Sequence, residues 1–97
     1  MYTIRWTREA ESDLENILTY YAERLEFEHV EAIEHRITSE IASLREFPNR
    51  CRVGRVSGTR EFVIARLPFI AVVAVVGDTV SVWSIVHTAQ EYPTNEK

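Results

Sequence analysis

The chain has 97 residues, of which 45% are apolar and 27% charged, and its formal net charge at pH 7 is −4. We expect one globular domain over residues 1–97, because this length supports a modest core without metal or disulfide staples. No apolar run is long enough to cross a membrane and no export signal is apparent, so a cytoplasmic protein without membrane contact is predicted. The lone Cys51 fits a reducing compartment and is expected to be a passive thiol.

The charge is unevenly distributed along the chain. Residues 1–44 carry ten acids and four arginines, whereas residues 45–97 carry seven basic residues and five acids. Lys97 is the only lysine, and arginine stabilises negative charge without giving up its proton. The chain is therefore not a generally basic nucleic-acid binder, and its positive charge gathers locally over residues 45–66.

The N-terminal part predicts a strand followed by a helix. Residues 2–6 alternate apolar and polar side chains, as in a strand with one buried face. Thr7 is a suitable helix N-cap, and acidic residues favour the first turns after it. One helical face then carries the apolar residues Ala10, Leu14, Ile17, Leu18 and Tyr21.

A second amphipathic helix is predicted after the polar residues 23–26. Its apolar face consists of Val30, Ile33, Ile37, Ile41 and Leu44. Pro48 ends this helix, so the two helices form an antiparallel hairpin. His29 and His35 are six residues apart and face different directions, so no metal site is predicted there.

Residues 47–59 are predicted to be a loop, since Pro48 and two glycines interrupt any regular pattern. Residues 60–66 follow as the first strand of the C-terminal half. Leu67 and Pro68 then mark a turn, because proline cannot donate to a strand ladder.

Two further strands form a predicted hairpin. Residues 69–76 are apolar on both faces, which is typical of a covered central strand. Gly77 and Asp78 predict a two-residue type II′ turn. Residues 79–87 alternate cleanly and are expected to pair back, and the remaining tail is polar. The order β-α-α-β-β-β predicts an α+β fold, with the helical pair on a mainly antiparallel four-stranded sheet.

The sequence resembles the RelE/ParE superfamily, the toxins of bacterial type II toxin–antitoxin systems. The similarity rests, in chain order, on TREAESDLENI (7–17), LREFP (44–48), GRVSGTREFV (54–63), LPF (67–69) and GDTVSVWSIVH (77–87). This resemblance implies a compact toxin that is held inactive by a cognate antitoxin wrapped around its surface. It implies no cofactor. In the superfamily, the RelE-like branch cuts mRNA in the ribosomal A site, whereas the ParE-like branch poisons DNA gyrase.

RNA cleavage through the 2′-hydroxyl needs a base, an acid and a charge that stabilises the phosphorane. Arg60 is the candidate stabiliser, because a guanidinium fork matches phosphate oxygens. His87 is a candidate acid or base, since histidine titrates near neutral pH; the alternative is a partly buried structural histidine. Glu61 is a candidate base, with an arginine ion pair as the alternative. Tyr92 can stack on a base, as C-terminal aromatic residues of some relatives do, or can cover the core.

The other arginines are candidates for nucleic-acid binding. Arg50, Arg52 and Arg55 are expected to hold the RNA backbone. Arg66 is expected to share the strand face of Arg60 by two-residue periodicity. The alternative is that this arginine patch docks an acidic segment of the antitoxin.

Two departures from the nucleolytic branch weaken the case for catalysis: residues 69–76 carry no charge, and the catalytic lysines of that branch have no counterpart. The sequence still favours ribosome-dependent mRNA cleavage slightly, by an endoribonuclease whose partners are the ribosome and mRNA. The first alternative is a ParE-like gyrase inhibitor that catalyses nothing. The second is an attenuated toxin that mainly binds its antitoxin.

Overall fold

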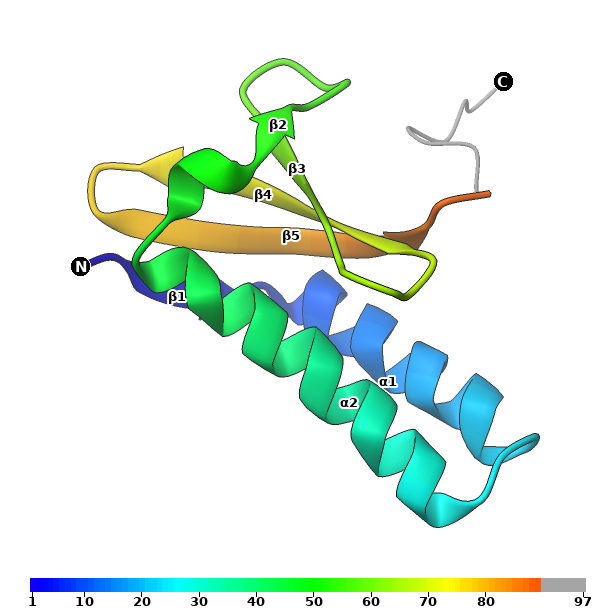
Figure 1. The fold of residues 1–97 in the computed structure, drawn as a ribbon. Coiled ribbons are helices and arrows are strands. Elements are labelled where there is room, and N and C mark those ends of the chain that lie inside the picture. Colours follow the sequence, from blue (N-terminus) through cyan, green and yellow to red (C-terminus); the bar gives the residue numbers. More distant parts are fainter. Residues whose placement is uncertain (90–97) are drawn as a thin grey trace, which may run out of the picture.

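In the structure, a computed structural model that describes residues 1–89, two helices pack on one face of a five-stranded sheet (Figure 1). The strands are β1 (Thr3–Trp6), β2 (Arg52–Val53), β3 (Arg60–Val63), β4 (Phe69–Val76) and β5 (Thr79–His87). Their order is β1-β5-β4-β3-β2, in which β1 and β5 are parallel and the other neighbours antiparallel. The predicted α+β class and mainly antiparallel sheet are confirmed. The predicted count of four strands is wrong, because β2 adds a fifth.

The helical hairpin consists of α1 (Arg8–Ala22) and α2 (Phe27–Ala42). Thr7 caps α1 as predicted: its Oγ1 accepts a hydrogen bond of 3.1 Å from the Ala10 N–H. The second helix ends earlier than predicted, at Ala42. Two 3-10 turns, η1 (Ser43–Arg45) and η2 (Pro48–Arg50), carry the chain on to β2. No helix within residues 1–89 is long and apolar enough to cross a membrane.

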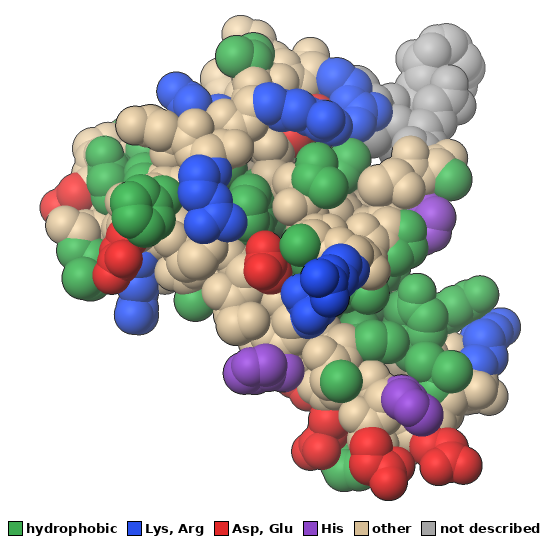
Figure 2. All heavy atoms as spheres, in the orientation of Figure 1, with side chains coloured by type: hydrophobic (Ala, Val, Ile, Leu, Met, Phe, Trp, Pro, Cys, Tyr) green, Lys and Arg blue, Asp and Glu red, His purple; other side chains and the backbone are tan. Residues whose placement is uncertain are grey.

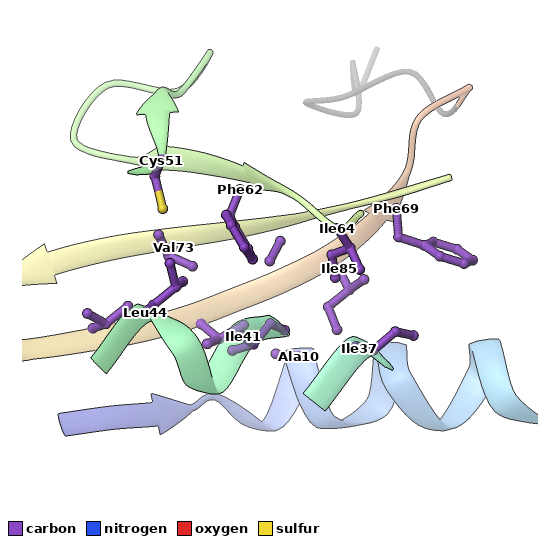
Figure 3. Packing of buried hydrophobic residues seen from close by; sticks show 13 residues of the cluster. Ala10, Ile37, Ile41, Leu44, Cys51, Phe62, Ile64, Phe69, Val73 and Ile85 are labelled. Carbon is purple, nitrogen blue, oxygen red and sulfur yellow. The ribbon is translucent and has the colours of Figure 1, made fainter. Parts of the chain in front are cut away.

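The core lies between the helices and the sheet (Figure 3). The predicted apolar face of the second helix supplies Ile37 and Ile41, and η1 adds Leu44; all three are fully buried. They pack in one cluster with sheet residues that include Phe62, Val73, Val80, Val82 and Ile85, and with Ile64, which follows β3. The helical periodicity therefore identified most of the contact face of the hairpin; Leu18 and Val30 are the exceptions, since neither belongs to the core clusters.

β4 is buried on both sides, as predicted for a covered strand. Ala71 and Val73 face the helices, whereas Ile70 and Val72 pack on the opposite face of the sheet. The turn into β5 also matches its prediction. Gly77 has φ +60° and Asp78 does not have a positive φ, which is the combination that a type II′ turn requires.

β5 does not alternate cleanly, contrary to the prediction. Val72 pairs with Ser84 but Val73 pairs with Val82, so Trp83 is an extra residue that forms a β-bulge. The bulge shifts the side-chain alternation by one position. Val80, Val82 and Ile85 consequently share the helix-facing core, and Trp83 is left 44% exposed.

Two further boundaries differ from their predictions. The predicted loop over residues 47–59 contains β2, whose two residues pair with Arg60 and Glu61; so short a segment carries no periodicity of its own. The predicted strand over residues 60–66 ends at Val63. It ends there because Arg66 adopts a left-handed conformation, φ +67°, within the turn that leads to β4.

Candidate functional site

The arginines of residues 45–66 do not form one continuous face. Arg52 pairs in register with Glu61, and Glu61 is opposite Val72, so both lie on the sheet face away from the helices. By strand alternation, Arg60 lies on the helix side, where its neighbour in register is Val73. Arg66 lies in the turn after β3, so the prediction that it shares the strand face of Arg60 is wrong.

Glu61 is the centre of the arginine cluster on the face away from the helices. Its carboxylate is 2% exposed. Oε1 accepts from Arg52 Nη2 at 3.1 Å and Nε at 3.3 Å, while Oε2 accepts from the Arg55 backbone N–H at 3.0 Å and Nε at 3.1 Å. Burial alone would raise the pKa of Glu61, but these hydrogen bonds outweigh it and hold the pKa below its ordinary value. Glu61 is therefore an ionised structural anchor whose oxygens already have donors.

The loop that Glu61 anchors has a defined shape. Its two ends are joined by a hydrogen bond of 2.8 Å from the Gly54 N–H to the Thr59 carbonyl. A Cβ on Gly54 would lie 2.2 Å from Thr59 Oγ1, so the two strands of the loop approach too closely for any other residue there. Thr59 is buried, and its Oγ1 donates to the Val56 carbonyl at 2.6 Å. The Arg55 backbone N–H and its side chain both donate to Glu61, so this loop geometry fixes the position of Arg55.

Arg50, Arg60 and Cys51 form a second group, on the helix side of the sheet. The Arg50 guanidinium lies over the Phe62 ring, 5.2 Å from its centroid. The Cys51 thiol points into the core toward Val73 (Figure 3). Burial raises its pKa, and the Arg60 and Arg50 charges offset that only in part, so the thiol is neutral. A neutral buried thiol is a poor nucleophile.

His87 lies at the far end of β5. Its ring makes an edge contact with Phe69, 5.5 Å between centroids, and its Nδ1 accepts from the Ala89 N–H at 3.0 Å. The imidazole is exposed and borders a groove of about 400 Å³, whose other lining residues are Asn16, Ile17, Tyr20, Tyr21 and Phe69.

The predicted catalytic residues do not meet at one point. Arg60 is opposite Val73 and His87 is opposite Phe69, on the two different neighbours of β4. Four residues along a strand span about 13 Å, and two interstrand spacings add about 10 Å across. Glu61 faces the other side of the sheet. The predicted Tyr92 lies outside the described residues.

Sequence reasoning missed an apolar surface at the tip of the helical hairpin, where Leu25 is 41% and Phe27 is 72% exposed. The local composition could have indicated this surface, because two large apolar residues lie among the acidic residues of segment 23–31. Within residues 1–89, no three His, Cys, Asp or Glu side chains gather as metal ligands do.

Comparison with known proteins places the chain among toxins. Residues 4–92 match the family model described as "ParE toxin of type II toxin-antitoxin system, parDE". A protein of Sinorhizobium fredii named "Putative toxin Y4kP" is 32% identical over 90 residues, which cover 93% of this chain and 92% of that protein. A solved structure titled "Chromosomal ParDE TA system from P. aeruginosa" superposes with a TM-score of 0.83 at 27% identity, over 90% of this chain and 96% of the other.

Proposed function

The chain belongs to the ParE toxin family of type II toxin–antitoxin systems, and from this premise we propose that it inhibits DNA gyrase by binding to it, without a catalytic step of its own. As a toxin of such a system it has an antitoxin partner. The resemblance to the ParE-like branch, whose members poison gyrase, supports this proposal. A gyrase inhibitor acts where the chromosome is, so the proposal includes a cytoplasmic location.

The observation that carries this proposal is the dispersal of the candidate catalytic groups. A phosphoryl-transfer site needs its acid, base and charge stabiliser within reach of one phosphate. Arg60 and His87 are instead separated by four residues of β4 and by two strand spacings. Glu61 is saturated by Arg52 and Arg55. Within residues 1–89 the candidate groups do not form one site, which supports inhibition of the target by contact.

Ribosome-dependent mRNA cleavage, which the sequence favoured, has less support. β4 carries no charged residue, and its first six residues, 69–74, are buried, so this stretch offers no charged side chain to a bound RNA. The family match is to the ParE branch. The remaining alternative is an attenuated toxin, which binds its antitoxin as the proposed gyrase inhibitor does but inhibits no enzyme.

The proposal is tested with purified toxin, relaxed plasmid and gyrase. We expect supercoiling to be inhibited or cleavage complexes to accumulate, and equimolar antitoxin to restore supercoiling. Unchanged supercoiling at saturating toxin would reject the proposal. In parallel, mRNA should remain intact in a translating extract. Cleavage that an Arg60→Ala variant abolishes, with its fold preserved, would establish the interferase instead.

A further inference from the structure

The tip of the helical hairpin carries an apolar groove. Leu18 and Ala22 of α1, Leu25 of the connection, and Phe27 and Val30 of α2 line a groove of about 400 Å³ on the molecular surface. Phe27, at the first position of α2, is 72% exposed, and Leu25 is 41% exposed. Neither belongs to the buried core clusters. The Leu25 and Phe27 side chains therefore add little to the buried core.

Negative charge gathers at the end of the hairpin that carries the groove. Glu15 borders it, and Glu23, Glu26, Glu28 and Glu31 are all exposed on the same end of the hairpin. Arg24, the nearby basic residue, is engaged locally: it donates to the Tyr20 carbonyl at 2.7 Å and stacks over the Tyr20 ring. Figure 2 shows acidic side chains gathered over the lower end of the molecule, where the hairpin lies, and basic ones over the β2 loop.

Contiguous exposed apolar surface with a charged rim is typical of protein interaction sites. The negative charge beside the groove limits which proteins can bind there. A second copy of this chain docked groove to groove would bring one acidic rim against another, and like charges facing each other oppose association. The occupant that fits is an apolar segment flanked by lysine or arginine.

We propose that this groove is the surface by which the toxin contacts its target enzyme. The inference rests on the proposed function. An enzyme that holds DNA presents basic surfaces to the phosphate backbone. The acidic rim complements such a surface, and Leu25 and Phe27 provide the apolar anchors that dominate binding energy at an interface. The arginines around Glu61 lie on a different face, so the groove is separable from them by mutation.

The test compares gyrase supercoiling in the presence of wild-type toxin and of the double variant Leu25→Ser/Phe27→Ser. We expect the concentration for half-inhibition to rise about tenfold or more for the double variant. The matched control is Phe47→Ser, a phenylalanine that is 58% exposed but lies between η1 and η2, and it should inhibit like the wild type. Inhibition by the double variant equal to the wild type would overturn the inference.

A charge variant keeps the test falsifiable if the double variant unfolds. Glu15→Lys changes an exposed side chain on the rim and leaves the core untouched. We expect weaker gyrase inhibition, an unchanged thermal midpoint and retained antitoxin binding. Unchanged inhibition by Glu15→Lys would overturn the inference. Loss of antitoxin binding without loss of inhibition would also overturn it, because the groove would then contact the antitoxin and not the target enzyme. The wild-type reaction separates the two proposals: if it shows no inhibition, the proposed function itself fails.

Discussion

At the scale of single residues, Glu61 does more for the structure than for chemistry. It joins β2, β3 and the intervening loop through five hydrogen bonds from Arg52 and Arg55. Its arginine partners are about half exposed, with side chains 56% and 44% accessible. Removing the carboxylate therefore leaves cations that water can solvate, and the loss is that of charge-assisted hydrogen bonds.

We predict that Glu61→Gln destabilises the protein by about 1–3 kcal/mol near neutral pH. The folded pKa of Glu61 is below its ordinary value of 4.5, so its contribution to stability is present above that value and is lost as the pH falls through the folded pKa. Urea unfolding from pH 7 down to acidic pH should show a steeper loss for the wild type than for Glu61→Gln. Parallel pH profiles would contradict the assignment.

At the scale of elements, side chains at and after the N-cap of α1 hydrogen-bond the β5 backbone beyond the point where β1 stops pairing with it. The last registered pair between β1 and β5 is Trp6 with Val82. Beyond it, the Thr7 Oγ1 donates to the Trp83 carbonyl at 3.0 Å, and the Ile85 N–H donates to Asp13 Oδ2 at 2.9 Å. Side chains of the helix start thus satisfy the backbone around the bulge, which fixes the helix against the strand.

We predict that Asp13→Ala costs about 1–3 kcal/mol, because it leaves the partly buried Ile85 amide without this acceptor. Hydrogen exchange of that amide should accelerate more than exchange elsewhere in β5. Glu11→Ala, which removes an exposed acid of the same helix, is the control and should leave the exchange of the Ile85 amide unchanged. An unaltered exchange rate at Ile85 would show that the bond does not stabilise the bulge.

At the scale of the whole molecule, the chain has a main core between the helices and the sheet, and two differently charged surfaces. The core cluster draws residues from both helices, from the 3-10 turn η1 and from strands β3, β4 and β5. The acidic hairpin tip and the arginines near β2 lie on different parts of the surface (Figure 2). Under the proposed function, this segregation gives the target enzyme and the antitoxin distinct faces to bind.

Because the core is shared, the domain should unfold as one cooperative unit. We predict that Ile41→Ala, at a fully buried position, lowers the free energy of unfolding by about 2–5 kcal/mol, and that Ile41→Val lowers it by about 0.5–1.5 kcal/mol. Circular dichroism and tryptophan fluorescence should report the same midpoint for each variant. Separate midpoints would mean that the helical hairpin and the sheet unfold independently.

The sequence by itself determined what depends on local spacing. The 3.6-residue pattern located both helices and their core face, Thr7 marked the cap, and Gly77 with Asp78 marked the hairpin turn. The continuous apolar run over residues 69–76 identified a strand covered on both faces. Each of these signals is contained within a few neighbouring residues, and the family resemblance drew on the same segments.

Only the tertiary structure decided which distant residues meet. The bulge at Trp83 reverses side-chain facing within β5, and β2 exists because Arg52 and Val53 pair with β3 across a loop. Strand register then places Arg60 and Glu61 on opposite faces of the sheet and keeps Arg60 far from His87. Periodicity along one element does not encode pairing between elements. The candidate site was therefore predictable as a list of residues, but its dispersal was not.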